Sequence, residues 1–206
     1  MSTVQIIAAF LALVGAAIAV IGTIATVVSM QRRTYFNEKA PVKGSPVSGV
    51  IWSFTTGMLP WKKESARLHW VAYLRGIILH IGIFIGAAFL IASPWLAAIP
   101  AWLLQATAAV LITAAVMGLA GFWLRRHDPI MRDLSTPDDY FSLGLTTLFL
   151  ASGALAAISP GLVPPFWAAS GITMAYVPFG KLRHFIYFLY TRAFLGLVFG
   201  RRGVLE

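Results

Sequence analysis

The chain consists of long apolar runs separated by short polar or proline-containing segments. The apolar runs cover residues 4–30, 74–97, 102–124, 137–159 and 164–190. Each run has about 20 residues or more, the length that an α-helix needs to cross the hydrocarbon core of a bilayer. The pattern therefore predicts an all-α, polytopic membrane protein with five transmembrane helices in a bundle.

Local signals support the ends of these helices. The fourth run opens with the segment Thr136–Asp139, in which a capping residue is followed by proline and by acids in the first turn. The first run lacks a basic N-terminal region and is longer than the apolar core of a typical signal peptide, so we expect a retained helix. In the fifth run, Pro178 and Gly180 predict an irregularity.

Composition agrees with this class. Of 206 residues, 59% are hydrophobic and 11% are charged, and the mean hydropathy is +0.80. Five spans with short connections take up nearly the whole chain, so we expect one membrane domain over residues 1–206 and no soluble catalytic domain. The absence of cysteine excludes intrinsic iron–sulfur clusters, thiolate zinc sites, disulfides and c-type haem attachment.

The basic residues predict the orientation. Lys and Arg in short loops stay on the cytoplasmic side. All sixteen lie between the first and second spans, between the third and fourth, or at and after the end of the fifth. The N-terminus is therefore expected outside and the C-terminus in the cytoplasm. This topology and anionic lipid at the inner leaflet account for the net charge of +9, which requires no nucleic-acid partner.

Two histidines, His80 and His184, lie inside apolar runs. His80 follows Arg75 by five residues, about 7 Å along its helix, and His184 lies about twenty residues beyond the outer end of an antiparallel helix. Both are expected near the inner boundary of the membrane. An unpaired imidazole in hydrocarbon is costly, whereas two imidazoles from facing helices fill both axial positions of a haem iron. The pattern predicts one b-type haem with His80 and His184 as iron ligands.

Neighbouring residues fit that cofactor. Gly76, Gly82, Gly86 and Ala87 leave space for a macrocycle and also permit close helix packing. The candidate cations for the haem propionates are Arg75, Lys181 and Arg183. The alternative is that each histidine hydrogen-bonds a neighbouring helix and that the glycines serve packing alone.

The other two histidines have weaker support as ligands. His69 lies in the basic segment before the second span, and His127 follows Arg125 and Arg126 at the end of the third. We expect both to be interfacial or solvated, because charged residues surround them. A second haem between them is the alternative.

Three segments together resemble the gamma-subunit family of respiratory nitrate reductases. They are Leu-His-Ile-Gly-Ile at 79–83, Pro-Phe-Gly-Lys-Leu-Arg-His at 178–184 and Thr-Pro-Asp-Asp at 136–139. The likeness extends from about Leu74 to the C-terminus. That family consists of five-helix membrane cytochromes b with an outward N-terminus, which oxidise quinol and pass electrons to a cytoplasmic iron–sulfur subunit. Related modules serve heterodisulfide-reductase-like complexes.

The chain departs from this family at the outer haem. Where family members carry two further histidines, this chain has Leu90 and Phe166. His80 and His184 match the ligand pair of the inner haem. The resemblance therefore implies one haem b per chain and the loss of the outer quinol site, with a quinone pocket near the inner haem in its place.

The resemblance also implies a biological role. It predicts a multi-pass protein of the bacterial or archaeal cytoplasmic membrane that transfers electrons between the quinone pool and a cytoplasmic iron–sulfur or flavin subunit. A haem-free membrane anchor that docks a soluble reductase is the main alternative, and a small transporter or channel subunit ranks last, because the spans contain few polar groups.

The semi-apolar segment 47–73 is expected to lie in the membrane interface as an anchor, with its tryptophans inward and its basic residues outward. Its alternative roles are a docking surface or the rim of the quinone site. Quinone chemistry moves protons, so a polar group must reach the pocket. The available candidates near this leaflet are Lys63, Glu64, His69 and Tyr73.

Overall fold

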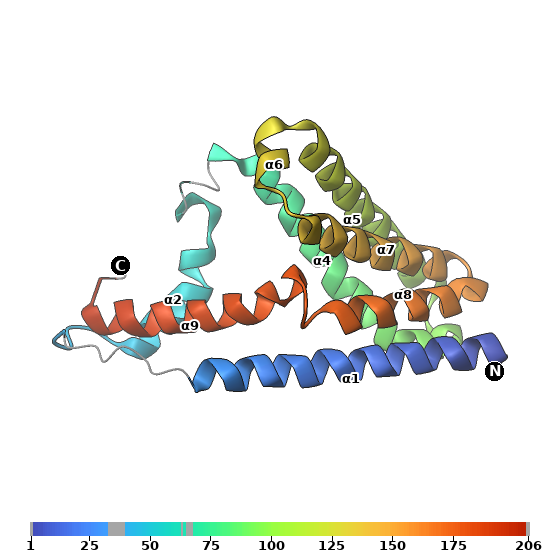
Figure 1. The fold of residues 1–206 in the computed structure, drawn as a ribbon, viewed down its shortest axis with the longest axis horizontal. Coiled ribbons are helices and arrows are strands. Elements are labelled where there is room, and N and C mark those ends of the chain that lie inside the picture. Colours follow the sequence, from blue (N-terminus) through green and yellow to red (C-terminus); the bar gives the residue numbers. More distant parts are fainter. Residues whose placement is uncertain (1, 33–39, 63, 65–67, 205–206) are drawn as a thin grey trace. The chain divides into compact units, whose positions relative to one another are not determined.

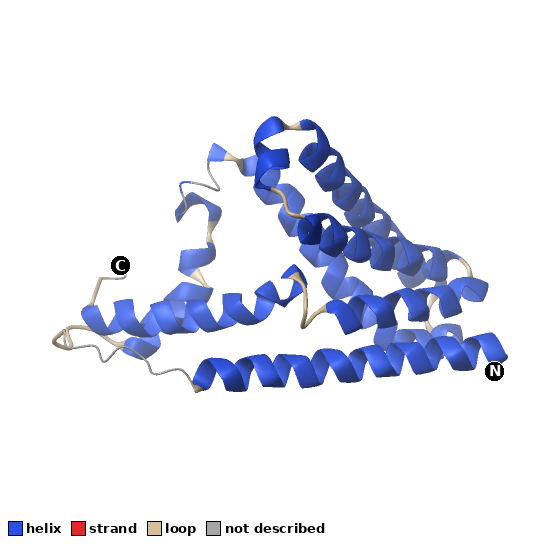
Figure 2. Cartoon of the chain, in the orientation of Figure 1, coloured by secondary structure: helices blue, strands red, loops and turns tan. Residues whose placement is uncertain are grey.

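The computed structural model describes residues 2–32, 40–62, 64 and 68–204, and all regular structure among them is helical (Figure 2). The chain divides into two compact units. Unit 1 comprises Met1–Gly22 and Leu74–Leu182, and unit 2 comprises Thr23–Tyr73 and Arg183–Glu206. Each unit is described separately below.

Among the described residues, four helices are long and apolar enough to cross a membrane; Figure 1 shows how they follow along the chain. They are α1 (Thr3–Gln31), α4 (Trp70–Ala92) with the 3₁₀ helix η3 that continues it (Ser93–Ala98), α5 (Ala101–His127) and α7 (Pro137–Ile158). These helices confirm the all-α class and agree with the first four predicted spans. The C-terminal end of α1 and the N-terminal end of α4 belong to unit 2.

The predicted fifth span, 164–190, is interrupted. It consists of α8 (Val163–Tyr176), the 3₁₀ helix η5 (Lys181–Arg183) and the beginning of α9 (His184–Arg202). The interruption contains Pro178 and Gly180, as the sequence predicts. With 14 residues, α8 is about 21 Å long, which is shorter than a hydrocarbon core of about 30 Å. The described residues therefore provide four candidate spans where the sequence predicts five.

Unit 1 is built around the contact between α5 and α7. The short helix α6 (Pro129–Leu134) connects these two helices. A side chain at Gly118 of α5 would overlap with Thr147 of α7, so this glycine allows the two helices to approach closely. The 3₁₀ helix η4 (Pro160–Leu162) then leads from α7 into α8. The most deeply buried large side chains are Leu111, Leu150 and Phe166, which come from α5, α7 and α8.

The start of α7 has the predicted cap. The Asp139 carboxylate accepts hydrogen bonds from the N–H and the hydroxyl of Thr136, both at 2.8 Å. Because these bonds satisfy an N–H that the helix cannot pair internally, they fix the first residue of the helix at Pro137.

Unit 2 is a pair of closely packed helices, α2 (Pro46–Phe54) and α9. Short 3₁₀ helices follow α2 at Thr56–Met58 and Pro60–Lys62. A Cβ atom at Gly196 would lie 2.7 Å from the carbonyl oxygen of Gly49, and one at Gly200 would lie 2.6 Å from that of Ser45. The Ser53 hydroxyl donates to the Arg192 carbonyl oxygen at 2.9 Å. The segment predicted as an interfacial anchor thus begins with a helix that packs on α9.

Two backbone hydrogen bonds within unit 2 also hold the C-terminal end of α9. The N–H groups of Lys43 and Gly44 both donate to the carbonyl oxygen of Arg201, at 2.9 and 3.1 Å. Gly203 then ends the helix with a φ of 66°, a left-handed conformation that glycine adopts without steric cost.

Candidate functional site

His80 lies on an exposed face of α4 within unit 1. Its Nδ1 atom is 2.7 Å from the carbonyl oxygen of Gly76, one turn earlier in the helix. Because a carbonyl can only accept, Nδ1 must carry the proton, and the Nε2 atom then carries the lone pair that a metal requires. When one ring nitrogen of a histidine binds a metal, a hydrogen bond from the other ring nitrogen usually orients the ring.

The small residues of α4 divide between two faces. Gly82 and Gly86 are buried, and a side chain at either position would collide with Ala114 of α5 or with Phe149 of α7. These two glycines therefore serve helix packing. A Cβ atom at Gly76, in contrast, would meet no atom within 4 Å. The flank of α4 at Gly76, one helical turn before His80, is thus open.

His184 is the first residue of α9 and is exposed within unit 2. Aromatic and cationic side chains follow it along the helix. The guanidinium carbon of Arg183 lies 5.8 Å from the centre of the Tyr187 ring, and that of Arg192 lies 5.6 Å from the centre of the Phe188 ring. The two predicted iron ligands thus belong to different compact units.

An aromatic cluster surrounds Phe166 in the core of unit 1. The Phe166 ring is fully buried, stacks on Phe89 of α4 at 5.5 Å between ring centres, and lies 5.7 Å from the ring of Phe149. A Cβ atom at Gly153 would be 3.0 Å from this ring. Leu90 packs against the same core. Side chains therefore fill the space around both Leu90 and Phe166.

Of the three candidate propionate cations, Lys181 is engaged within unit 1. Its Nζ atom is 2.5 Å from Oδ2 of Asp139, and its backbone N–H donates to Oδ2 of Asp138 at 3.0 Å. Arg75 is half-buried near the start of α4, and Arg183 is exposed next to His184.

Lys181 belongs to a polar cluster that the sequence does not reveal. Asp138 accepts hydrogen bonds from the hydroxyls of Tyr176 and of Ser142, the latter at 3.1 Å. Arg125 lies 3.9 Å from Asp139, and its backbone carbonyl accepts a hydrogen bond from Tyr140 at 2.9 Å. The cluster joins the end of α5, the start of α7 and the interruption after α8. The sequence signal is a pair of adjacent acids in an apolar chain, but Lys181, the partner of Asp139, is 42 residues away.

The quinone-site candidates lie in unit 2. The Tyr73 hydroxyl donates to the carbonyl oxygen of Met58 at 3.3 Å, and Glu64 and His69 are exposed. Lys63 lies outside the described residues. His127, in unit 1, is exposed, stacks on Trp123 at 4.6 Å between ring centres, and has its Nδ1 atom 2.8 Å from the Trp123 carbonyl oxygen.

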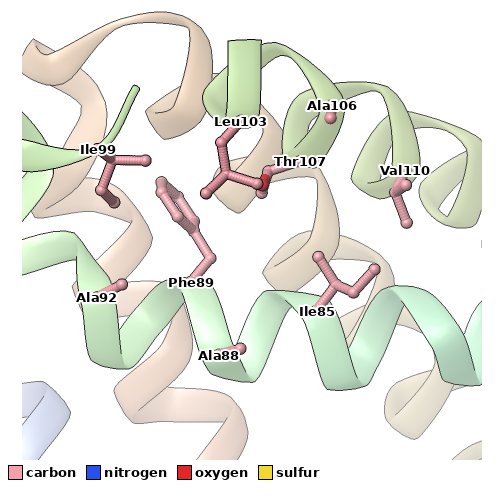
Figure 3. Close-up of a pocket in the computed structure, with 9 residues that line it drawn as sticks. All are labelled: Ile85, Ala88, Phe89, Ala92, Ile99, Leu103, Ala106, Thr107 and Val110. Carbon is pink, nitrogen blue, oxygen red and sulfur yellow. The ribbon is translucent and has the colours of Figure 1, made fainter. Parts of the chain in front are cut away.

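Unit 1 also contains an apolar cavity of about 320 Å³ between α4 and α5 (Figure 3). Phe89 and Leu103 project into it from the two helices, and Thr107 supplies the one hydroxyl of its lining. None of the predicted site residues lines this cavity.

Among the described residues, no group of three or more His, Cys, Asp or Glu side chains is arranged to hold a metal ion. A pair of axial imidazoles is a different arrangement, since the porphyrin supplies the other ligands of the iron. The chain matches no family model, no curated protein and no solved structure.

Proposed function

We propose that the protein is a membrane cytochrome b subunit, in which His80 and His184 bind one haem and electrons pass between membrane quinone and a cytoplasmic iron–sulfur or flavin protein. The observation that carries the proposal is the state of His80. His80 is exposed on an apolar helix, and the Gly76 carbonyl oxygen accepts the hydrogen bond that keeps the proton on Nδ1. Nε2 is thereby prepared to bind a metal.

The residues present fit a haem. His80 and His184 both supply exposed imidazoles, the open flank at Gly76 admits a planar group, and Arg183 places a cation next to one ligand. Arg75 is the corresponding cation near His80, whereas the charge of Lys181 is already paired with Asp139. When bound, haem supplies one-electron chemistry whose potential depends on its axial ligands and on the polarity around it.

The packing around Phe166 supports a count of one haem. A second porphyrin at the Leu90 and Phe166 positions would need the space that the rings of Phe89, Phe149 and Phe166 fill. Such a core is close-packed, so a large planar group cannot enter without displacing several side chains.

The proposed topology has five membrane crossings, with the N-terminus outside and the C-terminus in the cytoplasm of a bacterial or archaeal cell. In it, the last crossing is the segment 164–190, which contains nearly all of α8 and ends in the beginning of α9. All sixteen Lys and Arg residues then lie on the cytoplasmic side. The quinone and the redox partner are proposed from the resemblance of the motifs at 79–83 and 178–184.

The test is haem content per chain, measured by the pyridine haemochrome method on protein purified from membranes. We expect one haem in the wild type and less than one tenth of that in His80→Ala and in His184→Ala. Matched controls are His69→Ala and His127→Ala, which remove a histidine of each unit and should retain the haem.

Three results would contradict this assignment. Full haem in both His80→Ala and His184→Ala would show that these side chains are not the ligands. A wild type without haem, even when the cofactor is supplied during expression, would favour the haem-free anchor. Two haems per chain would contradict the single-haem proposal and direct attention to His69 and His127.

A further inference from the structure

The charge of the protein is concentrated in unit 2. Its segments contain eleven of the sixteen basic residues and three of the seven acidic ones, which gives unit 2 a net charge of +8 out of the total of +9. Unit 1 is nearly neutral. In particular, its segment 125–139 contains three basic and four acidic residues.

Five of the seven described cations of unit 2 are exposed. Among the described residues of this unit, Glu64 is the one acidic side chain against seven basic ones. Arg32, Lys43, Lys62 and Arg183 are all exposed. The ion pairs Arg125–Asp139, Arg132–Asp133 and Lys181–Asp139 lie in unit 1. We use the name basic surface of unit 2 for the four exposed cations Arg32, Lys43, Lys62 and Arg183 and the half-buried Arg192, which are distributed over the unit.

Apolar side chains are interspersed with these cations. Val47 and Ile51 on α2 are 68% and 59% exposed, Trp61 next to Lys62 is 66% exposed, and Leu189 on α9 is 52% exposed. Arg192 lies over the ring of Phe188. Cations mixed with exposed aromatic and aliphatic groups are typical of helices at a membrane surface, where the apolar groups enter the acyl boundary and the cations meet headgroups.

Covalent connection places this unit beside the membrane. Unit 2 contains the C-terminal end of α1 and the N-terminal end of α4, and both helices are candidate spans. Lipid headgroups are therefore within reach of the basic surface at all times. An acidic soluble protein would have to displace these headgroups from the basic surface. Both the negative charge of the headgroups and the covalent connection of unit 2 to two candidate spans therefore favour anionic lipid as the ligand.

We propose that the basic surface of unit 2 binds the headgroups of anionic phospholipids and so holds α2 and the C-terminal part of α9 on the membrane surface. Each Lys or Arg near an anionic bilayer contributes about 1 kcal/mol to such binding, and salt weakens the contribution. The proposal concerns the lipid alone and does not depend on haem.

The test uses the full chain in zwitterionic micelles, titrated with phosphatidylglycerol or with phosphatidylcholine, with the midpoint of thermal unfolding as the readout. We expect phosphatidylglycerol alone to raise the midpoint at 50 mM salt and to lose this effect at 500 mM. In Lys43→Gln/Lys62→Gln, the apparent affinity for phosphatidylglycerol should fall about 25-fold, because two cations are removed.

The matched control is Arg126→Gln/Arg132→Gln, which removes the same charge from exposed positions of unit 1 and should change the affinity less than threefold. Equal effects of the two lipids on the wild type, or equal losses in the two double variants, would overturn the proposal. Stabilisation by soluble poly-glutamate without stabilisation by phosphatidylglycerol would also overturn it and would identify an acidic protein as the partner.

Discussion

The ammonium group of Lys181 lies 2.5 Å from the Asp139 carboxylate, across 42 residues of sequence. Asp139 also caps α7 through Thr136, and Lys181 is the first residue of η5. This single pair therefore joins the start of a candidate span to the interruption between α8 and α9. The charge of Lys181 is therefore paired within unit 1.

Replacement of Asp139 by alanine should destabilise the protein by about 2 kcal/mol, because it removes a helix cap and a charge-assisted hydrogen bond together. Lys181→Ala should cost less, roughly 0.5 to 1 kcal/mol, since its side chain is 48% exposed. Unfolding in micelles followed by circular dichroism measures both. Arg132→Ala, which breaks the exposed pair with Asp133, is the control and should leave the unfolding midpoint unchanged.

The contact between α2 and α9 should not tolerate a side chain at Gly49. A Cβ atom there would lie 2.5 Å from the Cα atom of Gly200 and would overlap with the Gly196 carbonyl. Since the obstacle is backbone, we expect Gly49→Ala to destabilise the protein by about 3 kcal/mol. The control is Gly144→Ala in α7, whose Cβ would meet only Phe122 at 3.6 Å. It should stabilise by about 0.5 to 1 kcal/mol through helix propensity.

Phe166→Ala should cost about 3 to 5 kcal/mol, because it leaves a cavity beside Phe89 and Phe149 in the core of unit 1. Phe179→Ala removes the same ring from a position that is 71% exposed and should change the free energy of unfolding by less than about 0.5 kcal/mol. Similar losses in the two variants would mean that the aromatic cluster does not contribute to the core.

A bulky residue at Gly76 tests the proposed haem face directly. Its flank is open in the folded chain, so Gly76→Leu should preserve the unfolding midpoint of the haem-free protein. The side chain would nevertheless occupy the space beside His80, and we expect the haem content to fall at least fivefold. Ala109→Leu adds the same bulk at an exposed position of α5 and should retain the haem. Full haem in Gly76→Leu would place the cofactor elsewhere.

The sequence alone determines the class of the protein and much of its local structure. Long apolar runs predict five spans, and four of them are helices long and apolar enough to cross a membrane. The Thr136–Asp139 segment predicts the start of α7, and Pro178 with Gly180 predicts the interruption after α8. These features depend on hydropathy, helix caps and backbone restrictions. Because each of these acts within one segment, the sequence of that segment is enough to predict them.

Only the tertiary structure decides which segments meet. Gly49 and Gly196 pack together across nearly 150 residues, Lys181 pairs with Asp139, and Phe166 is buried between Phe89 and Phe149. The same glycine can permit packing, as Gly82 does, or leave open space, as Gly76 does. The difference depends on the neighbour that long-range packing brings to each position, and no local pattern specifies that neighbour.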